Sequence, residues 1–121
     1  MNKLHIIGNL TRDPELRTTT SGKDVCSFTV AVNRRNKSEG EPDADFFRVT
    51  AWNERGRLCK QYLSKGKKVS VVGSVSVNLY HKQDGTAAAS LEVNAEDVEF
   101  LSLKDGGFVP VQDDDDPFAV R

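Results

Sequence analysis

The sequence is poor in cysteine and histidine. Its two cysteines, Cys26 and Cys59, form no CxxC pair, and the two histidines, His5 and His81, lie far from them in the chain. Because a structural zinc site needs about four closely spaced Cys or His ligands, we exclude a metal site. Two isolated cysteines are typical of buried, reduced thiols.

Long hydrophobic runs are also missing. No stretch approaches the ~20 consecutive apolar residues of a membrane span. The first residues, MNKLHIIGNL, lack the long apolar segment and the small-residue cleavage site of a secretory signal, so we expect a cytoplasmic protein. A length of 121 residues, of which 37% are hydrophobic and 29% charged, fits one domain with a modest core.

The formal net charge of −1 hides a segregation of charge along the chain. Residues 1–104 contain 16 Lys or Arg against 13 Asp or Glu, a balance of +3, whereas residues 105–121 have a balance of −4. We therefore predict a mildly basic domain over residues 1–104 and a short, disordered acidic tail over residues 105–121. Composition alone also allows an ordinary domain with a solubilising tail.

The body reads as a series of strands interrupted by one helix. A bend or bulge is expected at Gly8 in the first strand, turns at residues 13–15 and 19–23, and a polar loop at residues 34–45. A hairpin turn is expected at Asp84-Gly85. The predicted strands cover residues 1–10, 25–33, 46–52, 67–80 and 87–101, and the predicted helix covers residues 53–64. In residues 67–80, alternation places an apolar face toward the core, formed by Val69, Val71, Gly73, Val75, Val77 and Leu79.

This order predicts an all-β fold. Five short antiparallel strands with one helix between strands 3 and 4 are typical of the OB-fold barrel. The pattern is also compatible with another small α+β sheet.

The third predicted strand has two different faces. Alternation places Phe47, Val49 and Ala51 on an apolar inner face and leaves Phe46, Arg48 and Trp52 on the other. A binding site for single-stranded nucleic acid combines aromatic rings, on which bases stack, with cations, which contact the phosphates. The same outer residues could instead form a subunit interface, and the cations could simply be solvated.

Longer stretches of the chain resemble the bacterial single-stranded DNA-binding protein family. The resemblance rests on GNLTRDPELR near the N-terminus, then DFFRVTAWN, CKQYLSKGKKVSVVGSV and LYHKQDGT, and it extends from Met1 to about Leu103. It implies an OB-fold, a homotetramer that wraps single strands, no enzymatic activity and no cofactor. It also implies a role in replication, recombination and repair in the bacterial cytoplasm, associated with the nucleoid.

The resemblance assigns functional positions as well. It implies stacking roles for Phe46, Trp52 and Tyr80. It implies DNA contacts for six cations: Arg17, Arg34, Arg35, Arg48, Lys65 and Lys82. The chain departs from the family by lacking an aromatic residue just after the second strand and any cation between Gly73 and Leu79. We therefore expect fewer phosphate contacts and a shallower salt dependence than in more basic relatives.

The acidic end resembles the family's partner-binding tip. The matching residues are Asp113, Asp114, Asp115, Asp116, Pro117 and Phe118. Replication, recombination and repair proteins are the implied partners, with an aromatic anchor and a carboxylate cluster making the contact. Residues 119–121 follow the phenylalanine, where the family's tip usually ends, so a vestigial acidic tail is the alternative.

The sequence is compatible with three other functions. The chain could be an OB-fold accessory module or RNA-binding protein. It could be a nuclease, although its carboxylates are dispersed. It could also be a scaffold that acts through its tail and scarcely binds DNA. Deleting residues 105–121 distinguishes the scaffold from a DNA-binding protein. If the body binds DNA, the truncated chain should bind it equally or more tightly, because the acidic tail competes with phosphate for the basic groove.

Overall fold

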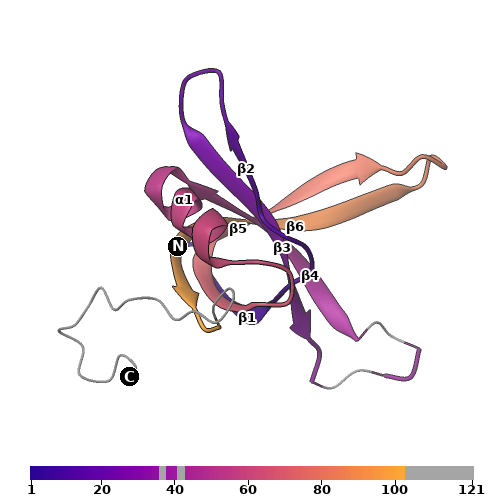
Figure 1. Ribbon diagram of the computed structural model, residues 1–121. Coiled ribbons are helices and arrows are strands. Elements are labelled where there is room, and N and C mark those ends of the chain that lie inside the picture. The colour runs from indigo at the N-terminus through magenta and orange to yellow at the C-terminus, as the bar shows by residue number, and fades with distance from the viewer. Residues whose placement is uncertain (36–37, 41–42, 103–121) are drawn as a thin grey trace.

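The computed structural model describes residues 1–35, 38–40 and 43–102 (Figure 1). The predicted boundary at residue 104, the acidic tail and its six tip residues lie outside this range. The elements are β1 (Leu4–Leu10), β2 (Glu15–Thr18), β3 (Asp24–Asn33), β4 (Ala44–Trp52), α1 (Asn53–Tyr62), β5 (Lys68–His81) and β6 (Ala87–Phe100). Nowhere in these ranges is there a helix with the length and apolarity needed to cross a bilayer.

The strands form one sheet that closes on itself. Their order is β1-β5-β6-β4-β3-β2, and β1 also pairs with β3. Five strands therefore form a closed ring, which removes unpaired edges, and the all-β OB-fold prediction is confirmed. The pairings are antiparallel except that of β4 with β6, which is parallel.

The short strand β2 is an addition to the five predicted strands, so the helix lies between β4 and β5. Its four residues are all exposed and pair only with β3. A strand of four residues without a buried side shows no alternation of polar and apolar residues. For this reason the pattern indicated only the flanking turns.

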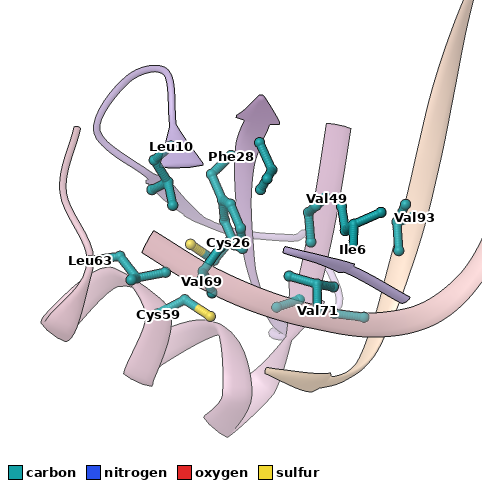
Figure 2. Packing of buried hydrophobic residues seen from close by; sticks show 13 residues of the cluster. Ile6, Leu10, Cys26, Phe28, Val49, Cys59, Leu63, Val69, Val71 and Val93 are labelled. Atoms are coloured by element: carbon teal, nitrogen blue, oxygen red, sulfur yellow. The ribbon is translucent and has the colours of Figure 1, made fainter. Parts of the chain in front are cut away.

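The core lies inside the ring and against α1 (Figure 2). Alternate residues of β3, β4 and β5 point inward, and Cys59 and Leu63 close one end of the barrel from the helical side. The predicted buried thiols are confirmed, since Cys26 and Cys59 are fully buried and unbridged. Burial raises the pKa of the Cys26 thiol to about 11 and that of Cys59 to about 12.

Two glycines allow strands to approach closely. A Cβ on Gly8 would lie 2.2 Å from the carbonyl oxygen of Ala31, and one on Gly73 would lie 2.1 Å from that of Asn94. No bulge occurs at Gly8 in the pairing of β1 with β5, because the register is continuous through that residue. The register shift occurs instead between Val72 and Gly73, where β5 pairs with β6.

Helix α1 is tied to the sheet by an ion pair. The Arg57 Nη1 atom donates a hydrogen bond of 2.7 Å to Asp24 Oδ2, and the Thr18 hydroxyl donates to Asp24 Oδ1 at 2.9 Å. These two hydrogen bonds hold the pKa of the Asp24 carboxyl below its usual value. The helix ends at Tyr62, two residues earlier than predicted.

The distal halves of β5 and β6 project from the barrel as a two-stranded arm (Figure 1). Val77 and Leu79 were expected to point into the core, and this prediction is wrong, because they are 60% and 77% exposed. The alternation is regular, but the arm extends past the barrel, so its inner side has no opposite wall. The arm therefore presents an exposed apolar face formed by Val77, Leu79 and Leu91.

Candidate nucleic-acid interface

The outer face of β4 carries the predicted aromatic and basic side chains. Val49 and Ala51 are buried in the core, as predicted, and this alternation directs Phe46, Arg48 and Trp52 away from it. The Phe46 side chain is 57% exposed, and Trp52 is 38% exposed. Two aromatic rings thus stand in solvent on either side of a guanidinium group.

Tyr80 reaches the same outer face from another strand. Arg48 is in register with Glu92 on β6, and Glu92 is paired with Ser76 on β5. Because Tyr80 lies four residues beyond Ser76, it points to the same side of the sheet. At about 3.3 Å per residue, the face from Trp52 to Tyr80 extends ~26 Å along the strands, which is room for several stacked bases.

Arg17 lies close to the Trp52 end of this face. It is paired with Val25 on β3, and Val25 is in turn paired with Trp52. Arg17 and Trp52 therefore lie on one transverse row, two strands apart, or about 10 Å. The predicted cation and the predicted stacking residue are brought together.

The remaining predicted cations are more scattered. Arg34 lies at the Phe46 end of β4, and its Nε atom donates a hydrogen bond of 3.0 Å to Asp45, which precedes Phe46. Arg35 is exposed and follows it. Lys82 lies in the turn of the arm, two residues after Tyr80. Lys65 lies apart from the aromatics, beside the β1–β2 turn, where its backbone N–H donates to Asp13 Oδ1 at 2.8 Å.

Sequence reasoning missed the carboxylate that faces Arg48. Glu92 is half-buried on β6 and stands directly beside Arg48 on the outer face. The two residues are 44 positions apart and meet through a parallel pairing, so no local pattern places them together. A carboxylate at the centre of the outer face lowers its positive potential, which agrees with the expectation of a shallow salt dependence.

The described residues offer nothing for metal chemistry. Within residues 1–35, 38–40 and 43–102, no three His, Cys, Asp or Glu side chains come close enough together to hold a metal ion. What the outer face offers is three rings and adjacent guanidinium groups, an arrangement suited to stacking and to phosphate contact.

Comparisons with known proteins agree with this geometry. The model of the single-strand binding protein family matches residues 1–101. The chain is 42% identical over 125 residues to single-stranded DNA-binding protein 2 of Clostridium acetobutylicum, covering 97% of this chain and 94% of the relative. It is 40% identical over 105 residues to single-stranded DNA-binding protein 1 of Staphylococcus aureus strain MSSA476, covering 86% and 67% of the two chains.

Proposed function

The chain belongs to the single-strand binding protein family, and from this premise we propose that it binds single-stranded DNA without sequence preference. The observation that carries the proposal is the shared outer face of Phe46, Arg48, Trp52 and Tyr80. Each stacked base contributes ~1–3 kcal/mol, and every base has a π-face, so stacking tolerates any sequence.

Duplex DNA is a poor ligand for this face. In a duplex, the bases are already stacked on one another and only their edges are open in the grooves. The rings of Phe46 and Trp52 lie on a strand of a closed barrel, where unpaired bases can stack on them. We therefore expect strong preference for single strands over duplex.

The wider role that we propose is non-enzymatic protection of single strands during replication, recombination and repair, in the cytoplasm and associated with the nucleoid. Homotetramer formation is part of the proposal. It is supported by the exposed apolar face of the arm, since monomeric proteins rarely leave contiguous apolar surface in water. Light scattering tests this assembly, and the mass of a single chain would contradict it.

The acidic tail is proposed to recruit partner proteins through residues 113–118. Deleting residues 105–121 tests this. The truncated chain should bind single strands at least as tightly as the full chain and should no longer capture replication and repair proteins. If the truncated chain retained those partners, the tail would have no part in recruitment.

The central experiment is a titration of the full chain with poly(dT), followed by the fluorescence of Trp52, the single tryptophan. A duplex of equal length is the control, and each titration is run at low and high salt. We expect strong quenching by poly(dT), little by duplex and weaker binding at high salt. Absence of quenching, together with no shift in a gel at low salt, would overturn the proposed function.

A further inference from the structure

A polar groove lies beside the outer face, between the β1–β2 turn and strands β3 and β4. Its walls include two arginines, Arg12 and Arg48, and its lining also contains Ser27 and Thr29. Two carboxylates, Asp13 and Glu15, lie on the side of the turn and β2. Arg48 belongs to the outer face described above, so the groove continues that face across β3.

Backbone hydrogen bonding fixes Arg12 at this position. The N–H of Thr11 donates a hydrogen bond of 3.0 Å to the carbonyl oxygen of Thr29, and Thr29 is in register with Arg48. The chain segment that contains Arg12 is thereby held at the level of Arg48, on the opposite side of β3 and about 10 Å away across the sheet. Arg12 is exposed, and no ion pair joins either arginine to a carboxylate among the residues that the structure describes.

The groove also contains a buried hydroxyl group. Ser27 is only 9% exposed, and within the described part of the chain its Oγ atom has no hydrogen-bond partner. The other buried serine, Ser70, is hydrogen-bonded to His5 Nε2 at 2.8 Å. Because buried hydroxyl groups are normally paired, Ser27 points to a polar ligand group in the groove.

The groove is balanced in formal charge, with two arginines against two carboxylates, so its suitability for an anion comes from its hydrogen-bond donors. Asp13 already accepts the backbone N–H of Lys65 at 2.8 Å, so part of its hydrogen-bonding capacity is used. Glu15 is exposed on β2 and paired with Ser27 in the sheet. Two guanidinium groups and two hydroxyl groups are all hydrogen-bond donors, and a phosphate oxygen is the acceptor that they suit.

We propose that Arg12 and Arg48 together hold one backbone phosphate of the bound strand, with the Ser27 hydroxyl donating to the same phosphate. This inference rests on the proposed single-strand binding and adds to it a contact at the β1–β2 turn. The strand would then leave the row of aromatic rings at Arg48 and cross β3 toward Arg12.

The test compares Arg12→Gln with the unaltered chain in poly(dT) titrations at several salt concentrations. Loss of one phosphate contact should lower the slope of log affinity against log salt by ~0.7, with affinity at low salt reduced roughly 3- to 10-fold. Ser27→Ala should also lower the affinity for poly(dT). Because Arg12 is exposed and forms no ion pair within the described residues, thermal unfolding of Arg12→Gln should match that of the unaltered chain.

Arg55→Gln is the matched control, since it removes the same charge from the exposed surface of α1. A salt slope that falls in Arg12→Gln but not in Arg55→Gln supports the phosphate contact. Equal slopes for Arg12→Gln and the unaltered chain, with tight binding in both, would overturn this inference and leave the proposed function standing. Failure of the unaltered chain to bind would overturn both.

Discussion

Phe46 leaves more than half of its surface in water, although phenylalanine gains about 1.5–3 kcal/mol when fully buried. Its neighbours explain why the fold keeps it there. Val49 and Ala51 take the inner positions of the strand, and any shift of register by one residue would place Arg48 in the core. The exposed ring is therefore fixed by the core on the other side of the same strand.

Replacing Phe46 with Ala removes one stacking ring and should weaken binding of poly(dT). A loss of ~1–3 kcal/mol per stacked base corresponds to roughly 5- to 150-fold in affinity. Because the ring is mostly exposed, thermal unfolding should change little. Fluorescence titration through Trp52 measures the effect, and Leu58→Ala, which removes an exposed apolar side chain from α1, is the control. Equal affinities of Phe46→Ala and Leu58→Ala for poly(dT) would show that Phe46 is not part of the interface.

At the scale of elements, β4 and α1 were the parts most open to prediction from sequence. Strict alternation in β4 predicted both of its faces, and the helix predicted over residues 53–64 is observed over Asn53–Tyr62. The position of Glu92 beside Arg48 could not be predicted, because a parallel pairing between distant strands leaves no local signal. The arm was misread for a related reason, since alternation shows which residues share a face but not where the barrel ends.

The register shift in β5 depends on a residue without a side chain. A Cβ at position 73 would lie 2.1 Å from the carbonyl oxygen of Asn94, which is backbone and has no room to move aside. Gly73→Ala should therefore lower the free energy of unfolding by about 1–3 kcal/mol, as measured by urea denaturation. Ser74→Ala, at the next position, is the control. Unchanged stability of Gly73→Ala would mean that the two strands can separate locally at little cost.

At the scale of the whole molecule, the two buried thiols make folding sensitive to alkaline pH. Their pKa values are raised by burial to about 11 and about 12, so above pH ~9 the unfolded chain loses protons that the folded chain retains. The free energy of unfolding therefore falls as pH rises from 9 toward 11, and each thiol contributes up to about 1.4 kcal/mol per pH unit. Below pH 8 the effect is absent.

Urea denaturation at pH 8 and pH 10 measures this dependence. The loss of stability between the two pH values should be smaller in Cys59→Ala by about 1.4 kcal/mol, because one of the two thiols no longer titrates. Comparing each protein with itself at two pH values cancels the constant effect of the cavity that the substitution creates. An identical loss in both proteins would show that other groups cause the alkaline instability.

The closed ring of strands also determines when each strand can pair during synthesis of the chain. β1 leaves the ribosome first, yet its long pairing is with β5, where Leu4 meets Gly73, and it shares only two paired positions with β3. At a synthesis rate of about 5–20 residues per second, β1 waits several seconds for its partner strand. During that interval the apolar sides of β1, β3 and β4 are open to other nascent chains. The topology that closes the ring of five strands therefore leaves these apolar sides most exposed while the chain is being synthesised.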